Sequence, residues 1–295
     1  RSPPYLNTEE EEADGILETM GIDYTKLARE GKLKPVIGRD KEIRSVIEIL
    51  ARKDTAGHDE AINNPVLLGE PGVGKSAIAK GLAKMIADRD VSLRPFWDYR
   101  VVYVQLSAMQ AGTGLRGSLE LRFQSLLEEC SKGQPTILFL DELHTIMGLG
   151  RTDGSSGMEE MLKPSLAEGL SCIGATTSDE WQEKVEVKNP PFAQRWIQVR
   201  VEEPSAEDMM QILLGCADDL ARRHLVHFSG EVLSAAISLG SKYMPYVASP
   251  RREIDQILNG GGAKVKIANS GLASVNDGAA VISQLVGYEV KPDAE

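Results

Sequence analysis

The sequence predicts an α/β fold: a parallel five-stranded sheet covered by helices, followed by a smaller and mainly helical domain. Three observations predict this fold class. Five short apolar segments lack the in/out alternation of half-exposed strands, helical patterns separate several of them, and no strand pattern follows residue 204. Strands buried on both faces, with helices between them, are typical of a parallel sheet. The predicted strands are residues 65–68, 101–104, 136–140, 171–175 and 197–201.

The chain divides into four predicted parts. Residues 1–30 carry the acidic run 9–12 and are expected to form an acidic linker or N-terminal extension. Residues 31–203 are expected to form the large α/β domain, residues 204–290 the helical lid domain, and residues 291–295 a tail.

Several helices can be placed by their caps and their apolar spacing. Asp40 is predicted to cap one helix, and Ser205 and Ser229 are predicted to cap two helices of the lid domain. A last helix is expected over residues 277–285, whereas the three glycines 260–262 are expected to form a flexible turn or a frayed helix end. One apolar stripe at helical spacing consists of Leu119, Phe123, Leu126, Leu127 and Cys130.

Composition excludes several classes of protein. The net charge of -11 over 295 residues argues against a nucleic-acid surface, which needs a clustered basic face. No apolar run approaches the ~18 residues of a membrane span, so no membrane contact is expected. Cys130, Cys172 and Cys216 are far apart and are interpreted as buried hydrophobes in a reducing compartment. We expect a cytoplasmic location, with an organelle matrix as the alternative.

One glycine-rich stretch has the spacing G-x-x-x-x-G-K-[ST], between the first predicted strand and a helical pattern. In this motif backbone N–H groups and the helix N-terminus surround a polyphosphate. The lysine reaches the β- and γ-phosphates, and the hydroxyl binds Mg²⁺. The sequence therefore predicts a site for ATP and Mg²⁺. Its residues are Gly69-Glu70-Pro71-Gly72-Val73-Gly74-Lys75-Ser76.

Two adjacent carboxylates, Asp141 and Glu142, follow the most apolar predicted strand. Ligands of open α/β sheets bind at the carboxyl ends of the strands. Asp141 is expected to hold Mg²⁺, partly through water, and Glu142 to orient and deprotonate the attacking water. Thr176 and Thr177 end another strand and are expected to hydrogen-bond the γ-phosphate or that water. His144 is interpreted as a structural or orienting histidine, because no second ligand supports a metal site there.

Together these motifs resemble the first ATPase module of the Clp unfoldases, which belong to the AAA+ family, over nearly all of residues 25–290. The resemblance implies an AAA+ fold, a ring that usually has six subunits, and ATP-driven unfolding of polypeptide substrates, with an adaptor or protease as a further partner. The motifs that carry it are residues 34–39, 69–76, 112–113 with 116–117, 138–148, 162–164 and 173–177.

The resemblance also assigns an arginine that acts on the γ-phosphate of a neighbouring subunit. The family has two adjacent arginines at this place, whereas this chain has Gln194 and Arg195. Arg195 is therefore the expected arginine finger, and the alternative is a surface or structural arginine.

A second departure lies in the pore loop that grips substrate in this family. Where the family has an aromatic step, this chain has Gly114 and Leu115 before Arg116. Leucine offers a passing substrate chain less contact area than an aromatic ring does. The sequence therefore leaves open whether this module threads substrate, that is, pulls it through the central pore. A non-threading assembly or regulatory subunit is therefore the main alternative function, and a nucleic-acid remodelling ATPase is a second one.

The adenine base is expected to pack on four apolar residues, although the lid segment 249–255 departs in part from the family's pattern. Two precede the first helix of the large domain, and two lie in the lid domain. Arg251 and Arg252 of the lid are interpreted as surface arginines, and the alternative is that one of them contacts phosphate. The four adenine-binding candidates are Val36, Ile37, Pro250 and Ile254.

Overall fold

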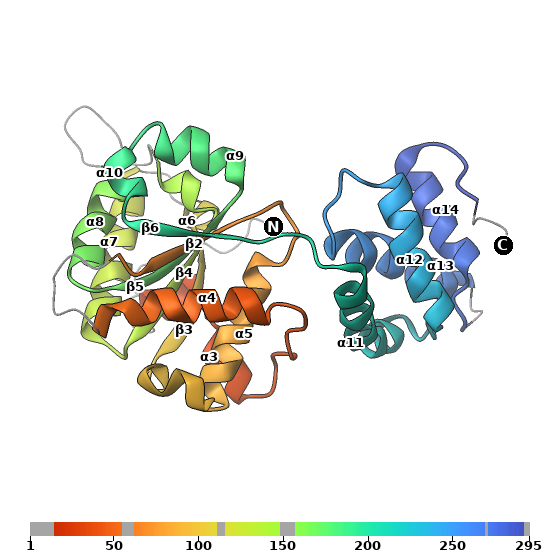
Figure 1. Ribbon diagram of the computed structural model, residues 1–295, viewed down its shortest axis with the longest axis horizontal. Helices are drawn as coiled ribbons and strands as arrows, with labels where there is room; N and C mark the ends of the chain where they lie inside the picture. The colour runs from red at the N-terminus through yellow and green to blue at the C-terminus, as the bar shows by residue number, and fades with distance from the viewer. Residues whose placement is uncertain (1–14, 55–61, 111–115, 148–156, 269–270, 292–295) are drawn as a thin grey trace, which may run out of the picture. The chain divides into compact units, whose positions relative to one another are not determined.

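The computed structural model describes residues 15–54, 62–110, 116–147, 157–268 and 271–291. The chain forms two compact units, each with its own core (Figure 1). Unit 1 consists of Arg1–Gly69 and Lys75–Arg200, and unit 2 of Glu70–Gly74 and Val201–Glu295.

Unit 1 is built on a six-stranded sheet with the strand order β1-β3-β4-β5-β2-β6. Five of these strands are parallel, as predicted, while β1 pairs antiparallel with β3 at one edge. The prediction of five strands was therefore one strand short. The strands are β1 (Gly21–Asp23), β2 (Asn64–Leu68), β3 (Arg100–Gln105), β4 (Thr136–Asp141), β5 (Ser171–Thr176) and β6 (Trp196–Arg200).

The additional strand lies in the segment that was expected to be an extension. The short helices α2 (Ile16–Met20) and α3 (Tyr24–Arg29) flank β1, so part of the 1–30 segment belongs to the α/β unit. A Cβ atom on Gly21 would lie 2.6 Å from Leu17 O and from a Val102 methyl group, so only glycine fits where α2 turns into the strand. Three residues are too few to produce an alternation that a sequence pattern could reveal.

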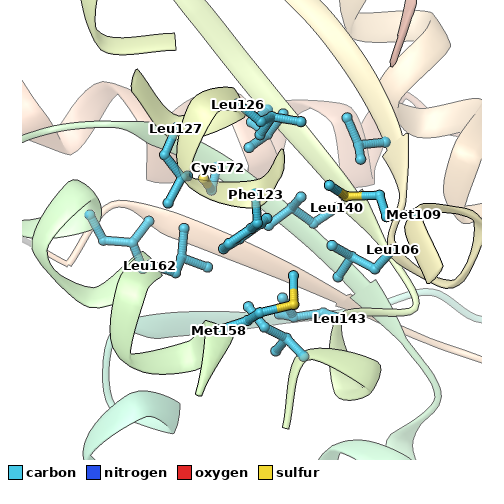
Figure 2. Packing of buried hydrophobic residues seen from close by; sticks show 14 of the residues in the cluster. Leu106, Met109, Phe123, Leu126, Leu127, Leu140, Leu143, Met158, Leu162 and Cys172 are labelled. Carbon is cyan, nitrogen blue, oxygen red and sulfur yellow. The ribbon is translucent and has the colours of Figure 1, made fainter. Parts of the chain in front are cut away.

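One face of the sheet packs against α7 (Arg116–Lys132) and α8 (Met158–Ala167). Phe123 lies at the centre of this core, between Leu140 of β4 and Leu162 of α8 (Figure 2). The predicted stripe on α7 is confirmed, because all five of its residues are buried. This core holds the carboxyl end of β4 in place.

The other face is covered by α3, α4 (Asp40–Leu50) and α5 (Lys75–Ala87), and α4 lies across β2 and β6 (Figure 1). Helix α5 packs closely on α4 at Gly81. A Cβ atom at this position would lie only 2.5 Å from Ile43 Cδ1, so the close approach requires glycine. Asp40 is the first residue of α4, and its side chain makes no capping hydrogen bond. Its predicted capping role was therefore wrong, although its charge suits the helix N-terminus.

Unit 2 is helical, and Ser205 and Ser229 are confirmed as N-caps that accept hydrogen bonds from Asp208 N and Val232 N. The expectation for the glycines at 260–262 was wrong, because they lie inside helix α13. A Cβ atom on Gly262 would lie 2.8 Å from the His224 ring, so close packing accounts for this glycine. The elements are α11 (Ala206–His224), α12 (Gly230–Tyr243), the π-helical turn η5 (Arg252–Leu258), α13 (Asn259–Ala268) and α14 (Val275–Val286).

Short helical segments complete the connections of unit 1. They are η1 (Ala51–Asp54), η2 (Val91–Phe96), α6 (Leu106–Gln110), η3 (Leu143–Ile146), α9 (Ser178–Glu180), η4 (Trp181–Glu186) and α10 (Pro190–Ala193). Among the helices of the described ranges, none has the length and apolar character that crossing a bilayer requires.

Candidate functional site

The glycine-rich loop joins the buried strand β2 to helix α5, which begins at Lys75. Gly72 and Gly74 have φ angles of 90° and 105°, a conformation that favours glycine over every other residue. The Lys75 ammonium donates a hydrogen bond of 2.6 Å to the carbonyl of Gly69 and so reaches back along the loop. Ser76 follows in the first turn of α5, where backbone N–H groups have no partners within the helix.

Strand register brings this loop and the two carboxylates to one edge of the sheet. The Gly69 N–H donates to Thr176 O at 3.2 Å, which fixes the start of the loop beside the end of β5. On the far side of β5, Asp141 pairs with Ala175. The carboxyl ends of β2, β5 and β4 therefore lie side by side and present Lys75, Thr176 and Asp141 at one edge.

The two carboxylates differ in their surroundings. Asp141 accepts two hydrogen bonds of 3.0 Å, from Glu142 N–H to Oδ1 and from the Tyr103 hydroxyl to Oδ2. Glu142 has a left-handed backbone with φ 55°, an uncommon conformation for a residue other than glycine. Its carboxylate makes no hydrogen bond or ion pair with the described residues. Asp141 is thus held in position, whereas Glu142 remains available to a ligand.

Tyr103 was not identified from the sequence. It lies on β3 directly opposite Phe139 of β4, and the two rings stack with centroids 5.7 Å apart. The pKa of Tyr103 is raised, first by burial and second by the charge of Asp141. The hydroxyl therefore keeps its proton and donates it in the hydrogen bond. In the sequence it is one residue of a buried strand, and no motif connects it with Asp141.

Thr176 and His144 form a second polar cluster at the same edge. His144 Nδ1 lies 2.8 Å from Thr176 Oγ1 and 3.1 Å from Glu180 Oε2. Thr177 caps α9 by accepting from the Glu180 N–H at 3.2 Å, and its hydroxyl donates to Glu180 Oε2 at 3.0 Å. The ring of His144 contacts the Thr176 hydroxyl, so this hydroxyl is the group that His144 could orient.

The ionisation of this cluster follows from its burial. Burial lowers the pKa of His144, although the charge of Glu180 acts in the opposite direction. Burial alone would raise the pKa of Glu180, but hydrogen bonds from Thr177 and Lys184 and the nearby positive charge lower it overall. Near neutral pH the cluster therefore contains a neutral imidazole beside an ionised carboxylate.

Arg195 lies away from this edge. It precedes β6, whose first residue Trp196 pairs with Asn64 at the start of β2. Arg195 is therefore at the amino edge of the sheet, roughly 20 Å along β2 from the glycine-rich loop at a rise of ~3.3 Å per residue. Arg195 is half-buried, and its guanidinium has no ion pair within the part of the chain that the structure describes.

The remaining site candidates are spread over the chain. Val36 and Ile37 are half-buried before α4, and Val36 Cβ lies 3.4 Å from where a Cβ atom of Gly81 would be. In unit 2, Pro250 and Ile254 are half-buried. Of the pore-loop residues, Gly114 and Leu115 lie outside the described residues, and Arg116 begins α7.

Arg251 is exposed as expected, but the interpretation of Arg252 as a surface residue was wrong. Arg252 is buried and donates to Glu253 Oε1 at 2.8 Å and to the hydroxyl of Ser249 at 2.7 Å. Glu253 is itself fully buried, so the pair is part of the interior of unit 2. The sequence does not reveal this pair because it lies among charged residues that look like a solvated helix surface.

Comparisons with known proteins agree with this geometry. The model of the ATPase family associated with various cellular activities (AAA) matches residues 65–184, which include the glycine-rich loop and both carboxylates. ClpB of Oceanobacillus iheyensis is 42% identical over 254 residues, which are 85% of this chain and 30% of that protein. Over 85% of its length the chain is therefore similar to a Clp-type ATPase.

Other Clp-type relatives are similar in sequence and in structure. ClpC of Staphylococcus aureus is 41% identical over 252 residues, 85% of this chain and 30% of that protein. The Saccharomyces cerevisiae Hsp104–ADP complex has a TM-score of 0.82 at 34% identity and covers 95% of this chain and 47% of the Hsp104 chain. An extended Hsp104–casein complex has a TM-score of 0.77 at 33% identity, over 92% of this chain and 45% of that one. The chain thus spans about a third of the length of the curated relatives it matches.

Proposed function

We propose that this chain is an AAA+ ATPase module that binds and hydrolyses Mg·ATP to drive the unfolding or remodelling of protein substrates. One observation carries the proposal: the Lys75 loop, Thr176 and Asp141 meet at the carboxyl edge of one parallel sheet, joined by the hydrogen bond from Gly69 N–H to Thr176 O. A positive loop beside two carboxylates is the arrangement that a metal-bound polyphosphate requires.

The donor groups fit ATP and Mg²⁺. The backbone N–H groups of the loop and the Lys75 ammonium would bind the phosphates, and the Ser76 hydroxyl and Asp141 would hold the metal. These are oxygen ligands of the kind Mg²⁺ prefers, and it keeps several waters in such sites. When bound, Mg²⁺ neutralises charge on the β- and γ-phosphates. Val36, Ile37, Pro250 and Ile254 are the proposed contacts of the adenine base.

Glu142 is the proposed general base. Its carboxylate is close in sequence to Asp141 but is not used in hydrogen bonds with described residues, so it is free to orient a water molecule and accept its proton. Thr176 and Thr177 are proposed to hydrogen-bond that water or the γ-phosphate. The contact between His144 and the Thr176 hydroxyl supports this role, since an oriented hydroxyl binds better than a rotating one.

Arg195 is proposed to act on the nucleotide of a neighbouring subunit. It lies at the amino edge of its own sheet, so its own glycine-rich loop is out of reach, whereas a loop presented by an adjacent copy is not. A ring of identical subunits, six in this proposal, supplies such a neighbour to every site. The guanidinium would stabilise charge that develops on the phosphoryl oxygens.

The proposed substrates are polypeptides, with an adaptor or a protease as a further partner. The similarity to ClpB, ClpC and the casein complex of Hsp104 supports this class of substrate. Gly114, Leu115 and Arg116 are the proposed pore loop.

The test of the ATPase proposal compares Glu142→Gln and Lys75→Ala with wild type. Glu142→Gln should bind ATP with unchanged affinity in calorimetry while steady-state phosphate release is lost. Lys75→Ala should lose ATP binding. Glu183→Gln is the matched control, because Glu183 is an exposed glutamate on η4, and it should behave as wild type. Wild-type turnover in Glu142→Gln would contradict the proposed base.

A second candidate function is a non-threading assembly or regulatory subunit. It is favoured by Leu115 in place of an aromatic residue and by Gln194 in place of a second arginine. Unfolding of a tagged substrate by wild type and by Leu115→Tyr separates the two functions. A threading module unfolds the substrate, and the aromatic side chain of Leu115→Tyr increases its unfolding rate. A regulatory subunit hydrolyses ATP without unfolding substrate. Stimulation of hydrolysis by DNA or RNA at low salt would instead indicate the nucleic-acid alternative.

A further inference from the structure

The hydroxyl of Tyr103 is the one side-chain donor recorded for the Asp141 carboxylate among the described residues. It donates to Oδ2 at 3.0 Å, while Oδ1 accepts the N–H of Glu142 at 3.0 Å. Each carboxylate oxygen therefore has one donor from the protein. An aspartate rotates about χ1 and χ2, and two donors on different oxygens fix both angles.

The Tyr103 ring is itself held from both sides. It stacks on Phe139 of β4, with centroids 5.7 Å apart, and on Tyr24 of α3, with centroids 5.5 Å apart. The Lys80 ammonium of α5 lies 5.4 Å from the centroid of the Tyr24 ring. The three rings form an aromatic ladder, and the Lys80 ammonium extends it to the helix that begins with Lys75.

Strand geometry explains why the hydroxyl reaches Asp141. Tyr103 pairs with Phe139, and Asp141 lies two residues beyond Phe139 on the same strand, so all three side chains are on one face of the sheet. The long axis of the ring carries the hydroxyl along the strand to the carboxylate. The stacked neighbours leave the ring little freedom to swing away.

We propose that Tyr103 is a positioning residue that holds the Asp141 carboxylate in the orientation needed for the magnesium ion of a bound nucleotide. This inference rests on the proposed function. Groups that hydrogen-bond a carboxylate ligand commonly affect metal affinity by about 10- to 100-fold, because they fix the ligand before the metal arrives. Tyr103 contacts Asp141 through its hydroxyl oxygen, and the stacked rings fix the position of that atom.

The experiment measures ADP binding by calorimetry with excess Mg²⁺ and with EDTA, in wild type, Tyr103→Phe and Tyr24→Phe. The ratio of the two affinities is the gain due to magnesium. Tyr103→Phe keeps the stacked ring and removes only the hydroxyl, so the gain should fall roughly tenfold while affinity in EDTA stays unchanged. Tyr24→Phe is the matched control: its hydroxyl makes no hydrogen bond to a described residue, and its gain should equal that of wild type.

A double-mutant cycle with Asp141→Asn tests the route through Asp141. In that background Tyr103→Phe should cause no further loss of the magnesium gain. A gain in Tyr103→Phe equal to that of wild type overturns the inference, and so does an equal loss with Mg²⁺ and with EDTA, which would indicate general damage. Failure of wild type to bind ADP at all would instead contradict the proposed function, so the two failures are distinguishable.

Discussion

His144 Nδ1 lies 2.8 Å from the hydroxyl oxygen of Thr176, at the carboxyl edge of the sheet. The same nitrogen lies 3.1 Å from Glu180 Oε2, an atom that only accepts hydrogen bonds, so Nδ1 carries the proton of the neutral ring. The Thr176 hydroxyl in turn donates toward Glu180 Oε2 at 3.4 Å. The threonine is thereby oriented by two side chains that sequence motifs alone do not connect with it.

The first prediction is that removal of the imidazole slows hydrolysis without affecting nucleotide binding. His144→Ala should lower kcat by roughly 10- to 100-fold, because displacing a positioned group near the reacting phosphate reduces the rate by such a factor. The ADP affinity should stay unchanged. His144→Asn retains an N–H donor near the position of Nδ1 and should recover much of the rate. The exposed His227 of unit 2 provides the control, and His227→Ala should turn over like wild type. Equal rates in His144→Ala and wild type would remove His144 from this role.

The second prediction concerns pH and stability. Because burial lowers the pKa of His144 below its ordinary 6.5, the unfolded chain holds more protons than the folded chain just below pH 6.5. The lowered pKa of Glu180 has the same effect below its ordinary 4.5. The free energy of unfolding should therefore rise with pH through both windows and gain nothing further from these two groups above pH 6.5. Urea denaturation at several pH values measures this, and His144→Asn should flatten only the upper window.

Much of the fold could be predicted from the sequence because it rests on local patterns. Buried parallel strands are continuous apolar runs, and the glycine-rich loop needs particular residues at fixed spacing, so both are visible without a structure. The edge strand Gly21–Asp23 was missed because its three residues owe their conformation to pairing with β3. The helical conformation of the glycines at 260–262 was also missed, since propensity favours a turn and packing against His224 decides otherwise.

The candidate site could be predicted only in part, for a related reason. Lys75, Asp141 and Glu142 belong to motifs, whereas Tyr103 and Glu180 matter through contacts between segments far apart or through side-chain direction. Arg195 was identified by resemblance, and its place at the amino edge follows from strand register rather than from its neighbours in sequence. Residues that act through another side chain carry no signature of their own.

The third prediction uses two adjacent glycines of α13. A Cβ atom on Gly261 would meet nothing closer than 3.9 Å, so Gly261→Ala should raise the stability of unit 2 by roughly 0.5–1 kcal/mol through helix propensity. At Gly262 the same atom would lie 2.8–3.0 Å from the rings of His224 and Phe228, and overpacking costs roughly 1–3 kcal/mol. Gly262→Ala should therefore be destabilising. Thermal unfolding of the full chain compares the two, and equal shifts would contradict the packing argument.

The fourth prediction concerns the buried pair Arg252 and Glu253 in unit 2. Arg252→Met removes the charge that faces the fully buried Glu253 and should destabilise the chain by roughly 3–5 kcal/mol. Arg251→Ala, one residue earlier and exposed, should change stability by less than about 0.5 kcal/mol. Urea denaturation followed by circular dichroism measures both. The double variant Arg252→Met with Glu253→Leu should regain part of the loss, since no unpaired charge is then left inside, and no recovery would count against the pair.

The last prediction tests whether Arg195 acts on a neighbouring subunit. Arg195→Ala should keep ADP affinity and lose roughly a thousandfold or more in hydrolysis, as for other arginine fingers, and Arg94→Ala, at an exposed position of η2, is the control. Because Arg195 lies at the opposite edge of its own sheet from Lys75, its partner site must belong to another copy. Mixing Arg195→Ala with Glu142→Gln should therefore restore part of the lost turnover, since some interfaces combine an intact Glu142 with an intact Arg195. Two inactive variants that remain inactive after mixing would exclude the arrangement between subunits.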